Sequence, residues 1–107
     1  VRWEEVGAAL SGAALLVNTT TLGMKGQPAL AIDLARLPER AVVAEVVYVP
    51  VLTPLLSAAQ SRGLRTADGL GMLLHQAVRG FSLWFGKEPE VTAELRALVA
   101  ADLADPK

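Results

Sequence analysis

Short apolar runs alternate with longer mixed stretches along the chain. Residues 15–17 are Leu-Leu-Val, residues 42–49 are rich in valine, and residues 64–67 form a third predicted strand. Apolar runs of this length without polar alternation are typical of strands buried on both faces of a parallel sheet. The order of strands and helices predicts an α/β fold built from parallel units. The helices are predicted at residues 4–10, 53–62, 68–85 and 92–103.

Capping residues mark the ends of these predicted helices. Thr53, Asp68 and Thr92 each stand where a side-chain oxygen can accept a hydrogen bond from the first turn. Gly63 and Gly86 suit the left-handed conformation in which many helices end. Three strands are few for a sheet that must be covered on both faces, so we expect the chain to be half of a doubly wound domain.

The composition is that of one ordinary globular domain, with 107 residues, 52% of them hydrophobic, and a formal net charge of −1. Because the basic residues are spread along the chain, neither nucleic acid nor a membrane surface is expected as a partner. The chain has no cysteine and a single histidine, His75, which argues against a metal site. No apolar run approaches the ~20 residues that span a bilayer, and the start carries neither Met nor a secretory apolar region. We therefore expect a cytoplasmic protein of which this chain is an excised piece.

Candidate binding residues lie where the predicted strands end, because open parallel sheets bind ligands outside the carboxyl ends of their strands. Three segments occupy such places: residues 18–24, 45–50 and 67–72. Taken alone, each segment also has an ordinary structural explanation. Asn18 and the threonines after it can cap a turn, and Tyr48 can be a strand-end aromatic. Residue types alone leave ligand binding and these structural roles open.

The same three segments resemble the shikimate dehydrogenase family. Residues 18–24, Asn-Thr-Thr-Thr-Leu-Gly-Met, are similar to its Asn-Ala-Thr-x-x-Gly-Met loop, and residues 48–56 to its Tyr-x-Pro-x-x-Thr-Pro-Leu-Leu segment. Residues 68–77 resemble its most distinctive motif, and residues 84–89 fit its closing Trp-Phe-Gly and Pro. The resemblance covers about residues 10–103. Thr19 stands where the family often has Ala, and Glu45 where it often has Asp; we expect both to be tolerated variation.

The resemblance implies a Rossmann-like NADP-binding domain, here a three-stranded parallel remnant with C-terminal helices. Residues 1–86, including the long helix 69–86, would be the second half of that domain. Residues 87–107 would form a helix that packs towards a missing N-terminal substrate domain. Members of the family interconvert 3-dehydroshikimate and shikimate in aromatic amino-acid and chorismate biosynthesis. Their proton-transferring Lys and Asp, the phosphate loop and the NADP 2′-phosphate site precede this segment. The resemblance therefore implies no catalytic residue in this chain, which we expect to be inactive alone.

Matching positions in the motifs imply individual roles. The resemblance implies that the cofactor contacts Thr20, Thr21, Val46 and Gly69. It implies that the ring hydroxyls of shikimate contact Tyr48 and Gln76. Helix geometry supports Gln76 independently, because seven residues separate it from Gly69 and place both on one helix face, roughly 10 Å apart along the axis. A polar amide on that apolar stripe suits a ligand site. His75 points about 100° away, and we expect a structural or surface role for it.

Two alternatives stay open at this point. One is a quinate/shikimate dehydrogenase that uses NAD, and the other is a non-catalytic binding module that has kept the fold. The residues that would distinguish them precede this segment in the family.

In the strand order 3-2-1-4-5-6, the strand at residues 15–17 would pair with a strand that this chain lacks. Its unpaired edge predicts self-association or association with the missing half.

Overall fold

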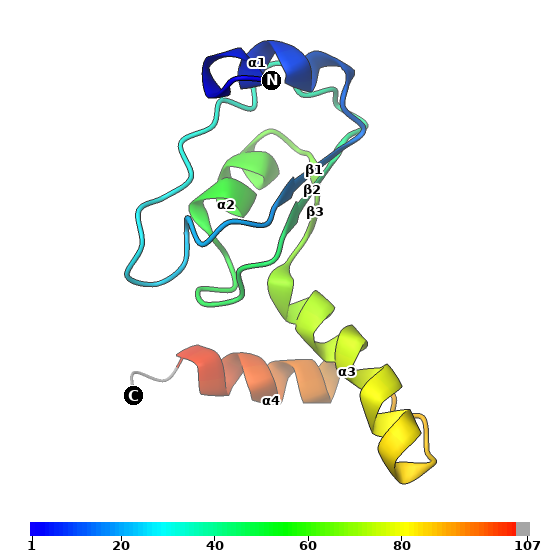
Figure 1. Cartoon of the computed structure of the whole chain (residues 1–107). Helices are drawn as coiled ribbons and strands as arrows, with labels where there is room; N and C mark the ends of the chain where they lie inside the picture. Colours follow the sequence, from blue (N-terminus) through cyan, green and yellow to red (C-terminus); the bar gives the residue numbers. More distant parts are fainter. Residues whose placement is uncertain (105–107) are drawn as a thin grey trace.

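A three-stranded parallel sheet organises the chain. The computed structural model describes residues 1–104, and β1 (Leu15–Asn18), β2 (Val42–Glu45) and β3 (Arg65–Ala67) lie side by side in that order (Figure 1). Leu15 pairs with Val42, and Val42 pairs with Arg65, so the carboxyl ends of all three strands meet at one edge. The predicted parallel α/β architecture is confirmed.

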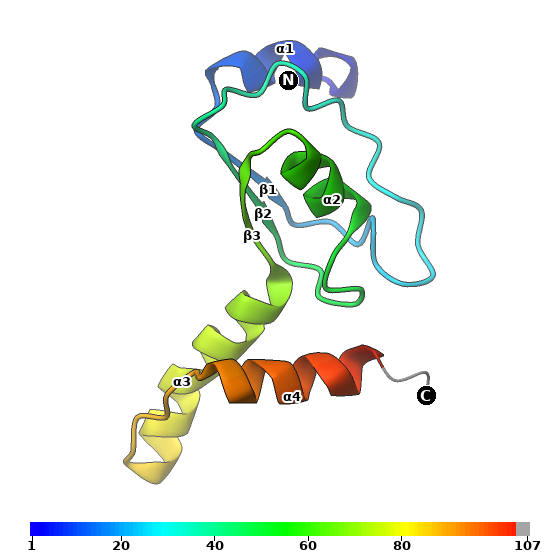
Figure 2. The same ribbon diagram turned by 180° about the vertical axis from the view of Figure 1, so that it is seen from behind.

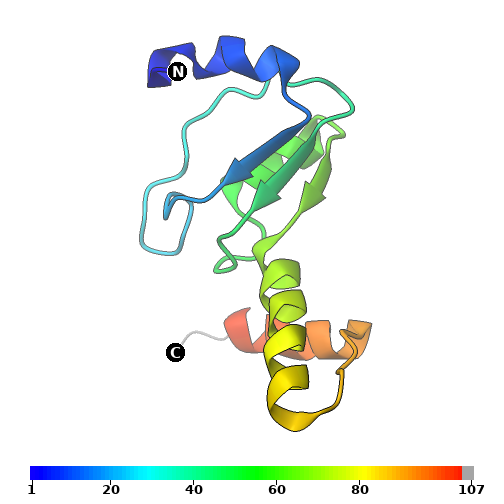
Figure 3. The same cartoon turned by 45° about the vertical axis from the view of Figure 1, so that its right-hand side comes forward.

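Residues 1–104 cover one face of this sheet and leave the other bare. α2 (Pro54–Ser61) and the long connection between β1 and β2 pack against it (Figures 1 and 2). Figure 3 looks onto the opposite face, with α2 behind the strands. On that bare face Leu15 and Val17 are 56% and 41% exposed, whereas complete doubly wound sheets cover both faces. The buried core comprises Leu10, Leu34, Leu37, Ala41, Val43, Leu55, Leu56, Ala59 and Leu64.

The central helices begin and end where the capping residues predict. Thr53 Oγ1 accepts a hydrogen bond from the first turn of α2 at 3.3 Å, and Gly63 follows the helix with a φ of +73°. α3 (Gly69–Phe85) begins after Asp68 and ends at Gly86, whose φ is +69°. Left-handed backbone of this kind favours glycine, because a Cβ would crowd the neighbouring carbonyl.

Both ends of the chain are also helical. The helix expected at residues 4–10 is a longer stretch of η1 (Trp3–Glu5), α1 (Val6–Ala9) and η2 (Leu10–Gly12), and only its middle is α-helical. α4 (Ala93–Ala104) follows Thr92, whose Oγ1 accepts a hydrogen bond at 3.1 Å. The last three residues of the predicted C-terminal unit 87–107 lie outside the described residues.

β2 is shorter than predicted, because strand pairing stops at Glu45 rather than continuing to residue 49. The last backbone bond to β1 joins the Val46 amide to the Asn18 carbonyl at 3.1 Å. The next amide, that of Val47, donates instead to the side chain of Glu45 at 3.1 Å. A side chain that binds a nearby backbone amide competes with the strand ladder. The rest of the valine-rich run, segment 46–49, therefore leaves the sheet without regular secondary structure.

α3 and α4 lie beyond the carboxyl edge of the sheet rather than on its faces. α3 runs away from the end of β3, and α4 turns back across it (Figures 1 and 3). No residue of α4 is buried, and Leu98 is 70% exposed. Among the described helices, none is both long enough and apolar enough to cross a membrane. Residues 1–104 also hold no group of three or more His, Cys, Asp or Glu side chains suited to a metal ion.

Candidate cofactor and substrate site

A pocket of about 300 Å³ opens where β1 and β2 end. One wall is the loop that follows β1, with Thr19, Thr20, Thr21 and Met24, and the other is segment 46–49. Four of the six predicted site residues therefore line one pocket: Thr20, Thr21, Val46 and Tyr48. They converge because parallel strands end at a common edge, as the site prediction assumed.

Two further pockets adjoin this one. Val46 also lines a pocket of about 530 Å³ on the bare face of the sheet, together with Met72 and His75 of α3. Tyr48 also lines a pocket of about 590 Å³, together with Lys25 and Leu103 of α4. Val46 and Tyr48 thus stand at the boundaries between neighbouring pockets, so the position of segment 46–49 shapes all three.

Three buried polar side chains lie behind segment 46–49: Asn18, 3% exposed, Glu45, 2%, and Thr53, 0%. Glu45 is at the centre. Its carboxylate accepts hydrogen bonds from Asn18 Nδ2 at 2.9 and 3.1 Å, and from Thr53 Oγ1 at 3.1 Å. The Val47 amide is its third donor. Buried polar groups are costly unless they are hydrogen-bonded, and no buried side-chain nitrogen or oxygen among the described residues lacks a partner.

The network reaches the threonine loop through Asn18. Asn18 Oδ1 accepts hydrogen bonds from the Thr20 amide at 3.0 Å and the Thr20 hydroxyl at 2.7 Å, while its Nδ2 also donates to the Leu22 carbonyl at 2.9 Å. The Leu22 amide donates to Thr20 Oγ1 at 3.1 Å. Because the single hydrogen of the Thr20 hydroxyl binds Asn18, this hydroxyl offers a ligand only an acceptor.

Sequence reasoning missed this network. That Glu in place of Asp at position 45 is tolerated variation stays a prediction; the structure adds that Glu45 has three hydrogen-bonding partners in three segments. One signal was present, because a carboxylate inside the apolar run 42–49 is unfavourable to bury without partners. The partners themselves come from residues 18 and 53, and their proximity is set by the fold.

Gly69 is buried and packs against the backbone that leaves β2. A Cβ at this position would lie 2.4 Å from the Val47 carbonyl oxygen and 2.6 Å from the Val46 carbonyl oxygen. Those distances are far inside van der Waals contact, so the chain needs glycine here whether or not a cofactor is nearby. The predicted cofactor contact of Gly69 stays a prediction.

Gln76 lies apart from the other predicted site residues. Its side chain is exposed on α3, and it is not among the residues that line the 300 Å³ pocket. His75, for which we expected a structural or surface role, is exposed but lines the neighbouring 530 Å³ pocket beside Val46. The contact of Gln76 with shikimate stays a prediction, and it requires a binding surface larger than the pocket at the end of β1 and β2.

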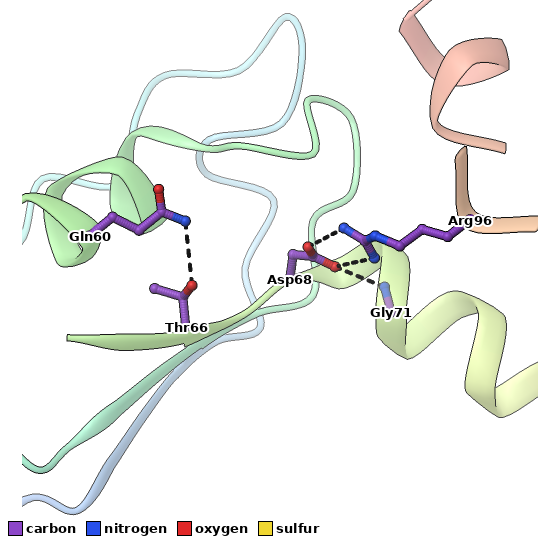
Figure 4. Close-up of polar contacts among 5 residues, drawn as sticks. All are labelled: Gln60, Thr66, Asp68, Gly71 and Arg96. Carbon is purple, nitrogen blue, oxygen red and sulfur yellow. Dashed lines mark hydrogen bonds and ion pairs between the residues drawn. The ribbon is translucent and has the colours of Figure 1, made fainter. Parts of the chain in front are cut away.

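An ion pair joins the start of α3 to α4. Both terminal guanidinium nitrogens of Arg96 donate to the Asp68 carboxylate, at 3.1 and 2.5 Å, and the Gly71 amide donates to the same carboxylate at 2.8 Å (Figure 4). The hydrogen bond from Arg96 holds the pKa of Asp68 below its ordinary value, although partial burial opposes this shift. The Gln60 side chain donates to Thr66 Oγ1 at 3.4 Å and links α2 to β3; this contact is also drawn in Figure 4.

Known proteins match this chain over nearly its whole length. A shikimate dehydrogenase (NADP(+)) of Rhodopseudomonas palustris is 72% identical over 104 residues, which are 97% of this chain and 37% of that protein. One of Nitrobacter winogradskyi is 72% identical over 94% of this chain and 36% of that protein. The profile described as the shikimate 5′-dehydrogenase C-terminal domain matches residues 69–98. Over nearly its whole length, the chain is similar to the C-terminal part of shikimate dehydrogenases.

The chain spans about 37% of the length of the curated relatives that it matches, and the matching profile is that of their C-terminal domain. Solved structures agree with this placement. The quinate dehydrogenase of Corynebacterium glutamicum in complex with NAD matches with a TM-score of 0.80 and 37% identity, over 92% of this chain and 34% of that one. The shikimate 5-dehydrogenase of Thermus thermophilus in complex with NADP(H) and shikimate matches with a TM-score of 0.74 and 30% identity. The match covers 96% of this chain and 37% of that one. The family resemblance and the Rossmann-like fold are confirmed.

Proposed function

We propose that this chain forms the C-terminal part of an NADP-dependent shikimate dehydrogenase, which interconverts 3-dehydroshikimate and shikimate. The observation that carries the proposal is the convergence of Thr20, Thr21, Val46 and Tyr48 on one pocket at the carboxyl ends of β1 and β2. Two relatives that are each 72% identical to this chain are named shikimate dehydrogenase (NADP(+)). Open parallel sheets bind nucleotides at this edge.

The pocket fits the nicotinamide end of the cofactor. Its described lining combines apolar side chains with hydroxyls and contains no charged side chain, which suits a flat ring rather than a phosphate. When bound, NADP(H) supplies the hydride chemistry. Val46 would contact the ring and exclude water, and the Thr20 hydroxyl would accept a hydrogen bond from a cofactor donor. Tyr48 and Gln76 would orient the ring hydroxyls of the substrate.

The remaining functions would come from the N-terminal part of the enzyme. The family resemblance implies that the proton-transferring Lys and Asp and the phosphate loop precede this segment, and residues 1–107 contain no G-x-G-x-x-G sequence. This chain would therefore hold one wall of the site. Residues 1–107 alone should form no NADPH from shikimate.

The test compares two purified proteins. One is the product of the full open reading frame that encodes this chain, and the other is residues 1–107 alone. We expect the first to reduce NADP⁺ in the presence of shikimate and the second to be inactive. Tyr48→Phe in the full product should raise the KM for shikimate roughly three- to tenfold, because one hydrogen bond to a substrate hydroxyl is lost. A folded full product that oxidises neither shikimate nor quinate would refute the proposal in favour of a non-catalytic module.

A quinate/shikimate dehydrogenase that uses NAD is the second candidate. The observation in its favour is the similarity to the quinate dehydrogenase in complex with NAD, with a TM-score of 0.80. The same assay separates the two candidates when it is run with each pairing of shikimate or quinate with NADP⁺ or NAD⁺. A higher kcat/KM for quinate with NAD⁺ than for shikimate with NADP⁺ would favour the second candidate.

A further inference from the structure

We propose that Glu45 is a positioning residue, which holds the two walls of the cofactor pocket in register from behind. The inference deepens the proposed function, on which it rests. Glu45 is among the residues that line the neighbouring pocket on the bare face. The residue as a whole is only 2% exposed, and its carboxylate makes its hydrogen bonds within the buried network. It would act through Asn18 and the Val47 amide, with no direct contact to the pocket between them.

The first step of the argument is where the carboxylate sits in the sheet. Backbone pairing between β1 and β2 ends with the Val46 amide on the Asn18 carbonyl. Beyond that point, the next backbone bond between the loop that follows β1 and segment 46–49 lies at the far end of the segment, where the Lys25 amide donates to the Val49 carbonyl at 2.8 Å. Glu45 bridges this gap, since it binds Asn18 on one side and the Val47 amide on the other. The carboxylate thus replaces the ladder at the place where the pocket begins.

The second step concerns what each hydrogen-bonding partner of Glu45 is attached to. Asn18 passes the restraint to the amide and hydroxyl of Thr20. The Val47 amide belongs to the opposite wall. Thr53, the third partner, caps α2 and anchors the carboxylate to the buried core. One side chain therefore ties both walls to a rigid helix.

The third step is that the network needs a group that only accepts. Asn18 Nδ2 faces both oxygens of Glu45, while Asn18 Oδ1 is required by the Thr20 amide. Because both oxygens of Glu45 face Asn18 Nδ2, a glutamine at position 45 would direct its NH₂ group at this donor whichever way its amide turned. If Asn18 turned its amide over to accept from that NH₂, its own NH₂ would then face the Thr20 amide. Glu45→Gln therefore creates a donor–donor conflict in either arrangement, whereas Glu45→Asp keeps an acceptor.

The test measures hydride transfer in the product of the full open reading frame. In Glu45→Gln, kcat/KM for the nicotinamide cofactor should fall roughly tenfold to a hundredfold, because small misplacements of reacting groups have effects of that size. The primary deuterium isotope effect with cofactor deuterated at the transferred position should rise, since a misplaced ring makes hydride transfer limiting. Glu45→Asp should recover most of the loss.

Leu10→Ala is the matched control. Leu10 is buried in the same core, 5% exposed, but precedes β1 at the other end of the sheet. It should lower stability while leaving the isotope effect and the cofactor KM unchanged. If Glu45→Gln resembles Leu10→Ala in these kinetic measurements, the carboxylate is only structural and the inference is wrong.

A second measurement keeps the inference separate from the proposed function. Amide hydrogen exchange at Thr20 and Val47 should quicken in Glu45→Gln and stay slow in Leu10→Ala, whatever reaction the protein catalyses. If the unchanged protein proves inactive on shikimate and quinate, the proposed function fails, and the exchange data still decide what Glu45 holds. Unchanged exchange at both amides in Glu45→Gln would overturn the inference even in an active dehydrogenase.

Discussion

Three glycines of one helix allow the packing of α3 against the sheet to be tested. Gly69, Gly71 and Gly80 all lie in α3, but their surroundings differ. A Cβ at Gly69 would lie 2.4 Å from the Val47 carbonyl oxygen, and one at Gly71 would be 3.5 Å from its nearest neighbour. A Cβ at Gly80 would meet nothing within 4 Å. Differences among the three alanine variants therefore report mainly on packing.

The expected magnitudes follow from two opposing effects. Alanine stabilises the interior of a helix by roughly 0.5–1 kcal/mol relative to glycine, so Gly80→Ala should raise the free energy of unfolding by about that amount. At Gly69, the first residue of α3, overpacking outweighs any such gain and typically costs 1–3 kcal/mol. The obstacle is backbone rather than a flexible side chain, so the upper end applies. Gly69→Ala should then destabilise the protein by about 2 kcal/mol.

Urea unfolding followed by circular dichroism measures all three variants under one condition. Gly71→Ala is the intermediate case and should change stability little, because 3.5 Å is ordinary contact. A Gly69→Ala protein as stable as Gly80→Ala would refute the close approach of α3 to Val46 and Val47. Because of the same contact, Gly69→Val should impair folding as well as any cofactor binding.

Three further predictions concern other parts of the chain. Because Arg96 lowers the pKa of Asp68, the pair stabilises the fold above the unfolded-state pKa, and this contribution is lost as pH falls through the lower folded-state value. Asp68→Asn should thus be less stable by on the order of 0.5–1 kcal/mol near pH 7, and urea titrations should show the difference vanishing well below about pH 4. Gln76→Ala in the full product should lower kcat/KM for shikimate roughly three- to a hundredfold with little change in the KM for NADP; loss of cofactor binding instead would mean that Gln76 faces the cofactor. Residues 1–107 alone should self-associate through the edge of β1, and a concentration-independent monomer in light scattering would contradict this.

The fold was predictable largely because its signals are local. Thr53, Asp68 and Thr92 cap helices as predicted, and Gly63 and Gly86 adopt left-handed backbone after them. Each of these features depends on residues within one helical turn. The end of β2 was predicted wrongly because it depends on a side chain, Glu45, that takes the next backbone amide. Propensity alone favours continuing a valine-rich strand.

The candidate site was predictable to the extent that it follows from topology. Thr20, Val46 and Tyr48 come together because two parallel strands end at one edge. Gln76 did not join them, since its placement depends on the direction in which α3 leaves the sheet. Figure 1 shows α3 running away from the strand ends, so residues two turns along the helix are carried away from the pocket. A helical-wheel argument fixes the face of a residue but not the course of the helix.

The motifs that carry the family resemblance contain supporting residues as well as candidate contacts. The side chains of Asn18 and Thr53 both donate hydrogen bonds to Glu45, and both residues are buried behind the pocket. Gly69 is required by its contact with the backbone of Val46 and Val47. Thr20 and Tyr48, by contrast, lie at the pocket itself. A motif therefore identifies a family, because residues that support the pocket and residues that contact a ligand must occur together at fixed spacing. Burial and hydrogen bonding are needed to distinguish the supporting residues from the contacting ones. On this reasoning Glu45, which stands just outside the motif at residues 48–56, is one of the residues that support the pocket.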